Sequence, residues 1–134
     1  IIKGHCEIGG DLLKGGNSKL LKIARTVALT HHEHWDGSGY PMGMPGKKIP
    51  LVGRIVAVCD VFDALTTQRA YKEAWEFEEA VKEIQRLNHT FFDPRIVHLF
   101  IENLPAIRRV YDHFSKSNEE FYSISDAILV GLKH

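Results

Sequence analysis

The segment 31–41, which reads HHEHWDGSGYP, constrains the fold of this chain more than any other stretch. Three histidines and a glutamate fill its first four positions, and turn-forming residues dominate the rest. Residues 35–50 hold four glycines and three prolines, which excludes a regular helix or strand. We therefore predict a long loop, whose order is favoured by Trp35 and Tyr40. Loops of this length in small domains are usually functional or disordered.

Both flanks of this loop carry apolar residues at helical spacing. Residues 20–28 repeat at steps of three and four, which predicts a helix that ends near His31, after a capping break at 15–18. The run 51–65 is either a helix or, around 55–58, a buried strand; its length of about fifteen residues favours the helix. The predicted fold class is all-α. Further helices are expected at 1–13, 77–87, 95–102, 105–114 and from Asn118 or Ser125 to Lys133.

Charge and cysteine usage argue against several classes of protein. The 17 basic and 17 acidic residues balance, which disfavours a general nucleic-acid or anionic-membrane surface, although a local basic pocket stays open. Cys6 and Cys59 form no disulfide framework, so a reduced, cytoplasmic setting is the simpler interpretation. No stretch reaches the roughly eighteen apolar residues that a membrane helix needs. The 134 residues suit one domain or most of one, and the start at Ile1, inside what reads as a motif, suggests a fragment.

Four residues form a candidate metal site of imidazole and carboxylate ligands, which suit iron, manganese, zinc or nickel: His5, His31, His32 and Asp60. Adjacent histidines on a helix diverge by about 100°, so both rings reach one site only if the helix ends there or two neighbouring ions are bound. Asp60 falls in an apolar run, and we expect it to be buried and to need a partner such as a metal. The alternative is that the histidine pair is a surface feature and Asp60 caps a helix. Ordinary surface or core roles are expected for His89, His98, His113 and His134.

The order of motifs along residues 1–100 resembles that of the HD-GYP family. The matching segments, which are far more specific together than singly, are His5 with Gly9, His31–Glu33, Asp36–Pro41, Ile49–Pro50, Arg54–Val58, Asp60–Thr66, Arg69 and Phe92–Pro94. The resemblance implies an all-α HD-superfamily helical bundle and a bacterial phosphodiesterase that hydrolyses cyclic di-GMP to the linear dinucleotide or GMP. It implies two or three divalent transition-metal ions as cofactors, iron or manganese first, with zinc or nickel as alternatives.

The resemblance also assigns roles to individual residues. Arg69 would hold the substrate phosphate beside catalytic Asp60, since a guanidinium fork suits phosphate oxygens, and Lys72 would add a weaker contact. The metal ligands would be His5, His31, His32 and Asp60. The loop that gives the family part of its name would border the active site and recognise GGDEF-type or other signalling proteins; here it is Gly39, Tyr40 and Pro41.

Four residues near this site have roles that the sequence leaves open. Trp35 or Tyr40 could stack on a guanine base of the substrate, or Trp35 could anchor the loop to the core. Asp63 and Glu33 could each orient a metal ligand through a hydrogen bond. Alternatively, Asp63 could cap a helix end or form a salt bridge, and Glu33 could be solvated.

The chain departs from the family pattern at several positions. Ala70 stands where a proline is usual and His34 where an arginine is usual. The histidine–aspartate doublet that names the superfamily should precede His5, and these residues do not include it. We therefore expect 1–134 to be a single HD-GYP-type domain that lacks its N-terminal helices and is inactive alone, within an active longer parent that membrane segments could tether. A catalytically inactive module that binds a cyclic dinucleotide or a protein is the alternative, and a homodimer stays open.

Overall fold

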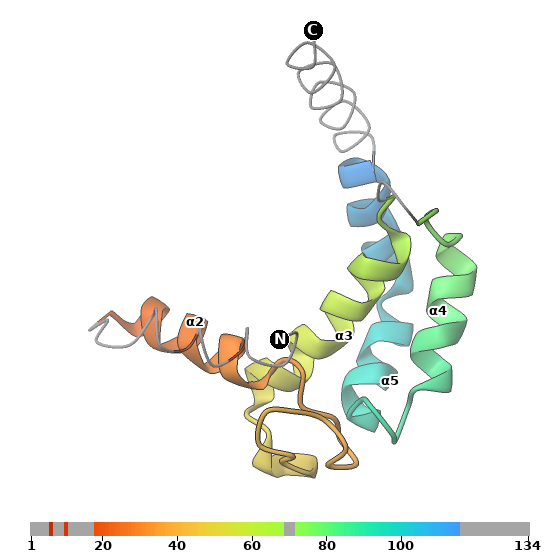
Figure 1. The fold of residues 1–134 in the computed structure, drawn as a ribbon. Coiled ribbons are helices and arrows are strands. Elements are labelled where there is room, and N and C mark those ends of the chain that lie inside the picture. Colours follow the sequence, from red (N-terminus) through yellow and green to blue (C-terminus); the bar gives the residue numbers. More distant parts are fainter. Residues whose placement is uncertain (1–5, 7–9, 11–17, 69–71, 116–134) are drawn as a thin grey trace, which may run out of the picture. The chain divides into compact units, whose positions relative to one another are not determined.

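The computed structural model describes Cys6, Gly10 and residues 18–68 and 72–115. Cys6 and Gly10 are helical, and the rest of the predicted helix at 1–13 and the segment after 118 lie outside the described residues. The described part contains isolated β-bridges but no β-strand, so the all-α prediction is confirmed. Its elements are α2 (Lys19–Thr30), the short 3-10 helix η1 (Gly46–Lys48), α3 (Leu51–Thr66), α4 (Phe77–Arg86), α5 (Pro94–Glu102) and a helix at 104–115 (Figure 1).

The chain divides into two compact units, Ile1–Leu99 and Phe100–His134. All candidate ligands belong to the first unit. A single domain over 1–134 stays a prediction. Among the helices that the structure describes, none combines the length and the apolar character that crossing a membrane requires.

The helix α2 begins and ends where the sequence predicts. Ser18 Oγ accepts a hydrogen bond from Leu21 N at 3.1 Å, so the polar break before the helix supplies its N-cap. Near its other end α2 packs against α3, where Gly53 lies next to Thr30. A Cβ atom on Gly53 would overlap the Thr30 side chain, so the glycine permits this close approach. The contact fixes the position of the α2 terminus, and with it His31, relative to α3.

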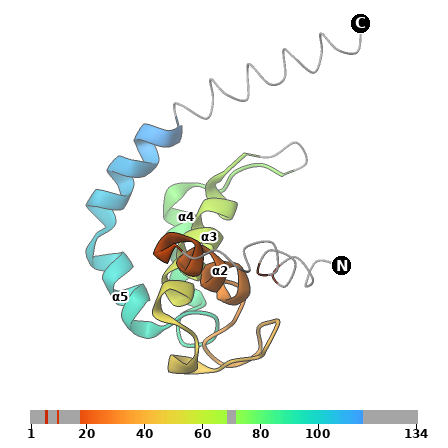
Figure 2. The same ribbon diagram turned by 90° about the vertical axis from the view of Figure 1, so that its left-hand side faces the viewer.

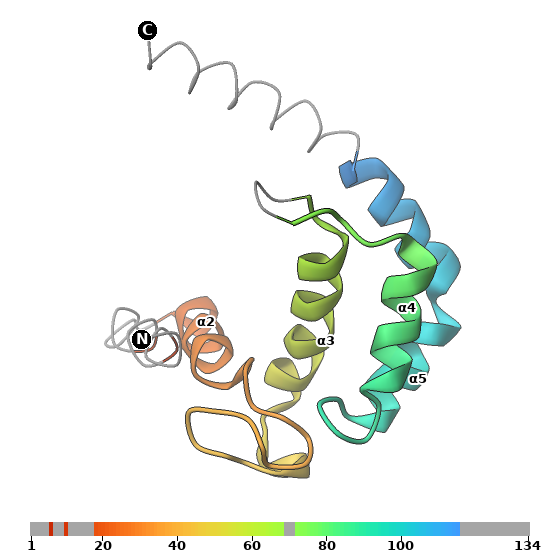
Figure 3. The same cartoon turned by 45° about the vertical axis from the view of Figure 1, so that its right-hand side comes forward.

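The helix α3 lies between α2 and α4 (Figure 3). It is helical over the whole predicted length, so the strand alternative at 55–58 is wrong. Asp60 is exposed, so the expectation that it is buried is also wrong. The physical reason is that α2 meets α3 at Gly53, about two turns before Asp60, and leaves the turn that carries this carboxylate open. The buried residues of α3 are Gly53, Ala57, Val58 and Phe62.

The helix α4 is amphipathic, as its sequence predicts. The ring of Phe77 meets that of Phe62 on α3 edge-on, with 5.5 Å between the ring centroids. The next helix, α5, begins at Pro94 behind a cap formed by Asp93. The buried face of α4 is the predicted stripe of Phe77, Ala80, Val81 and Ile84.

A buried ion pair joins α3 to the start of α5. Arg54 Nη1 donates to Asp93 Oδ2 at 2.7 Å, and the two side chains are 10% and 0% exposed. Arg54 Nε also donates to the carbonyl oxygen of Ile49 at 2.9 Å, so the same guanidinium holds the end of the loop. Burial alone would raise the pKa of Asp93, but hydrogen bonds from Arg54 and Arg95 outweigh burial and lower that pKa below its ordinary 3.8. The carboxylate is therefore charged at neutral pH.

Candidate metal centre

The long loop connects the end of α2 to the start of α3 and lies at the N-terminal end of α3 (Figure 2). Its one short helical turn, η1, was not predicted from the glycine and proline content. Glu33 organises the loop from within: it is 1% exposed, and its two carboxylate oxygens accept hydrogen bonds from Met42 N at 2.6 Å and Met44 N at 2.8 Å. Because these amides satisfy the buried charge, the solvated alternative for Glu33 is wrong.

The loop also folds back on its own beginning at Gly39. A Cβ atom there would overlap the backbone of His32, Glu33 and His34, so only glycine allows this close approach. Tyr40 N donates to the carbonyl oxygen of His32 at 3.1 Å, which fixes the next residue beside the histidine pair. The Tyr40–Pro41 bond is cis. The glycine of the predicted loop motif is thus required by the backbone geometry.

A second set of contacts ties the loop to the turn before α5. Trp35 N donates to the carbonyl oxygen of Phe91 at 3.0 Å, and Asp36 N donates to that of Thr90 at 2.9 Å. The ring of His34 stacks on Phe91 with 3.8 Å between centroids. Burial lowers the pKa of His34, although Asp36 and Glu33 oppose this change, so the ring is mostly neutral at neutral pH. The Trp35 backbone therefore anchors the loop, and a contact of its ring with substrate stays a prediction.

His31 and His32 come together because α2 ends at Thr30. The sequence argument required a helix end for adjacent histidines to share a site, and His31 is the C-cap residue. Its Nδ1 lies 2.7 Å from the carbonyl oxygen of Val27, so Nδ1 carries the proton and Nε2 carries the lone pair. A backbone partner of this kind is usual for a metal-binding imidazole. The two rings lie 4.1 Å apart between centroids, and His32 also stacks on Tyr40 at 5.0 Å.

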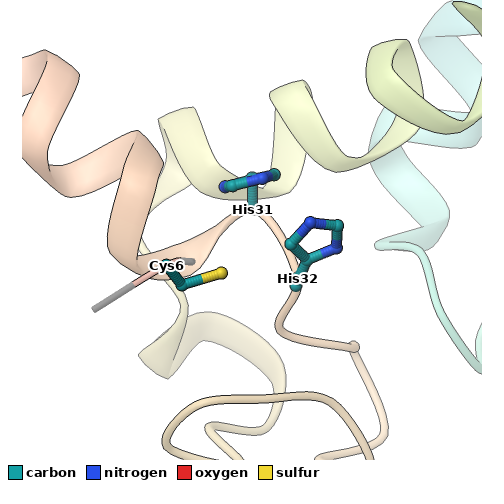
Figure 4. A group of neighbouring side chains, drawn as sticks. All are labelled: Cys6, His31 and His32. Atoms are coloured by element: carbon teal, nitrogen blue, oxygen red, sulfur yellow. The ribbon is translucent and has the colours of Figure 1, made fainter. Parts of the chain in front are cut away.

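The third member of this group is Cys6, which the sequence argument missed. Cys6 is 1% exposed, and the ligand atoms of Cys6, His31 and His32 all lie within 4.8 Å of one another. Figure 4 shows the sulfur directed toward the two imidazole rings at the end of α2. His5, the predicted ligand beside it, lies outside the described residues. The only signal in the sequence was the position of a metal-binding side chain next to His5.

Asp60 faces the same site from α3. It lines one hollow with His31 and His32, although it does not belong to the group within 4.8 Å. Burial, followed by the negative charges of Cys6 and Asp60, raises the pKa of Tyr40. The complete lining is His31, His32, Glu33, His34, Ala57, Asp60, Val61, Phe91 and Phe92.

The remaining predicted site residues are Lys72, Asp63 and Arg69. Lys72 is exposed, with Nζ 5.9 Å from the centre of the Trp75 ring. Asp63 Oδ1 accepts a hydrogen bond from Thr67 Oγ1 at 3.4 Å, next to the end of α3, and its orientation of a metal ligand stays a prediction. Arg69 lies outside the described residues. The substrate contacts of Arg69 and Lys72 stay predictions.

The donor set fits a transition-metal ion. The two imidazoles lie within 4.8 Å of the thiol of Cys6 and line one hollow with the carboxylate of Asp60, and these are the groups that bind zinc, iron, cobalt and nickel in proteins. The orientation of His31 by Val27 fits the same use. The arrangement could bind a metal ion next to the predicted GYP loop.

Several known proteins are similar to this chain. A family model described as HD domain matches residues 1–96. The cyclic di-GMP phosphodiesterase response regulator RpfG of Xanthomonas campestris is 41% identical over 118 residues, which are 88% of this chain and 31% of RpfG. A cyclic di-GMP phosphodiesterase of Thermotoga maritima is 44% identical over 111 residues, which are 83% of this chain and 30% of that protein. The chain thus spans less than a third of the length of either relative.

Relatives that act on a mixed cyclic dinucleotide match as well. The 3′3′-cGAMP-specific phosphodiesterase 2 of Vibrio cholerae is 42% identical over 103 residues, or 77% of this chain and 20% of that protein. The crystal structure of a cyclic GMP-AMP specific phosphodiesterase of Vibrio cholerae aligns with a TM-score of 0.62 and 27% identity, over 80% of this chain and 24% of that chain. These matches confirm the resemblance seen in the sequence motifs.

Proposed function

The chain belongs to the HD-domain family, and on that premise we propose that it carries the metal centre of a phosphodiesterase that hydrolyses cyclic di-GMP. The observation that carries the proposal is the convergence of His31, His32 and Asp60 on one hollow beside Tyr40. Relatives named for cyclic di-GMP and for 3′3′-cGAMP both support a cyclic dinucleotide as the substrate class. Both nucleotides contain guanine, so an aromatic ring at the site suits either one.

Different residues of this chain would bind the metal ions and the substrate phosphate. His5, His31, His32 and Asp60 would hold two or three divalent ions, iron or manganese first, with zinc or nickel as alternatives. Bound ions of this kind lower the pKa of a coordinated water and neutralise charge on phosphoryl oxygens. Arg69, with a weaker contribution from Lys72, would hold the substrate phosphate.

The loop would position both the metal site and the substrate. Tyr40 is held by the hydrogen bond from its backbone N to the carbonyl oxygen of His32 and by stacking on the His32 ring, so it can orient this ring while it offers its other face to a substrate base. Trp35 would be the second stacking candidate. The outer surface of Gly39, Tyr40 and Pro41 would recognise GGDEF-type or other signalling proteins. Activity in the cytoplasm belongs to the same proposal, and a homodimer stays open.

The test is metal analysis of the full-length protein purified without chelator, combined with an assay of cyclic di-GMP and 3′3′-cGAMP hydrolysis. We expect bound transition metal and hydrolysis of cyclic di-GMP, and loss of both in His31→Ala. The matched control is His98→Ala, because His98 is exposed on α5. Nucleotide binding without metal and without hydrolysis would contradict the proposal and favour a binding module.

A further inference from the structure

Cys6 occupies a position that the proposed function does not need. Its side chain is 1% exposed, and its sulfur lies in one group with ring nitrogens of His31 and His32, all within 4.8 Å. The side chain comes from the N-terminal part of the chain, whereas the rings come from the end of α2, and Figure 4 shows the sulfur between the two elements and directed at the rings. One thiol and two imidazoles therefore meet from two segments of the chain.

The ordinary alternative is that Cys6 is a small buried apolar residue. Its surroundings do not fit that role, because two imidazoles lie next to the sulfur and Tyr40 is within electrostatic range of it. The spacing is also close to that of a metal site. Tetrahedral bonds of about 2.3 Å to sulfur and 2.0 Å to nitrogen place the ligand atoms about 3.3–3.5 Å apart, so the group, whose atoms lie within 4.8 Å of one another, would contract by about 1.5 Å at most on binding.

We propose that Cys6 is a thiolate ligand of the ion that His31 and His32 hold. On binding, the sulfur–metal bond forms and the thiol proton passes to solvent. The inference rests on the proposed function for the presence of a metal site, and it adds a sulfur ligand that the predicted histidine and aspartate set lacks. A thiolate is soft, so this ion is zinc, iron(II) or cobalt(II) in preference to manganese.

The direct test is the electronic spectrum of the full-length protein, stripped of metal and reloaded with cobalt(II) under anaerobic conditions. A cobalt–thiolate bond gives a sulfur-to-metal charge-transfer band in the near ultraviolet, which imidazole and carboxylate ligands do not give. We expect this band in the natural protein and in Cys59→Ser, because Cys59 is outside the ligand group. We expect its loss in Cys6→Ser, with the ligand-field bands of histidine-bound cobalt still present.

A second measurement covers the case in which Cys6→Ser folds poorly, which circular dichroism would reveal. In the natural protein and in Cys59→Ser, a stoichiometric amount of zinc should displace bound manganese. The cobalt charge-transfer band of the same proteins should disappear as zinc replaces cobalt. In a folded Cys6→Ser, zinc affinity should fall by at least about tenfold, because loss of even an outer partner of a ligand costs that much. Manganese affinity should change less, since manganese has little preference for sulfur.

The outcomes separate this inference from the proposed function. Cobalt that binds in stoichiometric amount without a charge-transfer band in the natural protein would overturn the thiolate ligand and leave the phosphodiesterase proposal standing. A band that persists in folded Cys6→Ser and is lost in Cys59→Ser would also overturn it. Failure of the natural protein to bind any cobalt, zinc or manganese would overturn both proposals together.

Discussion

The carboxylates that anchor the loop and the carboxylate that lines the hollow beside it differ in burial and in hydrogen bonding. At the anchors, Glu33 and Asp93 are each 1% exposed and receive hydrogen bonds from backbone amides or arginine. In the hollow, Asp60 is exposed, and no hydrogen bond or ion pair joins it to another described residue. A buried carboxylate whose oxygens accept hydrogen bonds stabilises the fold. An exposed carboxylate that accepts none keeps its lone pairs for a ligand. Stability and metal binding should therefore depend on different acids.

The largest loss of stability is expected for Asp93→Asn. Removing one charge of a buried pair leaves Arg54 uncompensated, which typically lowers the free energy of unfolding by about 3–5 kcal/mol. Urea denaturation at neutral pH measures the change. The control is Asp112→Asn, whose partner Arg108 and own side chain are 45% and 56% exposed, and which should change stability much less. Equal losses in the two variants would mean that the buried pair does not hold α3 to α5.

A smaller loss is expected for Glu33→Gln. The side-chain amide offers one acceptor oxygen where the carboxylate offers two, and its NH₂ group would face a backbone N–H, so the free energy of unfolding should fall by about 2 kcal/mol. Hydrogen exchange should accelerate at the amides of Met42 and Met44. Glu79→Gln, at an exposed position on α4, serves as the control. Unchanged exchange at both methionine amides would argue against Glu33 as the organiser of the loop.

Part of the Asp93 contribution should depend on pH. The folded pKa lies below the ordinary value of 3.8, so the charged pair adds stability that is fully present above that value and is lost as the pH falls through the lower folded pKa. The stability difference between the natural protein and Asp93→Asn should therefore be constant near neutral pH and should narrow below about pH 4. Acid titration of both proteins, followed by circular dichroism, gives the comparison. A difference that widens in acid would reverse the sign argued for this carboxyl group.

The smallest change in stability is expected for Asp60→Asn. An exposed side chain that forms no hydrogen bond or ion pair with another described residue should alter the free energy of unfolding by no more than about 0.5 kcal/mol. Metal content and hydrolysis should nevertheless fall to background, because the amide is a poor ligand for a transition metal. Elemental analysis and thermal unfolding of the same metal-free and metal-loaded samples measure both effects. If the Asp60→Asn protein were destabilised but kept its metal, Asp60 would not differ from Glu33 and Asp93 in the role argued for it.

Helix positions and the convergence of His31 with His32 could be predicted, because they depend on local periodicity and on where a helix ends. The environment of the acids could not. Asp60 lies in an apolar run, yet it is exposed because α2 contacts an earlier turn of α3. The partners of Glu33 are backbone amides nine and eleven positions away, across a loop whose path no propensity specifies. Cys6 was missed because its approach to the histidines is tertiary.

The close approach of Gly39 to the backbone of the histidine segment also affects how sequences of this kind are interpreted. Backbone packing requires that glycine whether or not the neighbouring side chains bind metal. Replacing the glycine would disturb folding, whether or not the protein is catalytically active. A descendant of this chain could therefore lose its metal ligands through single substitutions and still keep Gly39, Tyr40 and Pro41. The tripeptide therefore identifies the shape of a loop. Whether a chain that carries it is an enzyme has to be decided from positions such as His31 and Asp60.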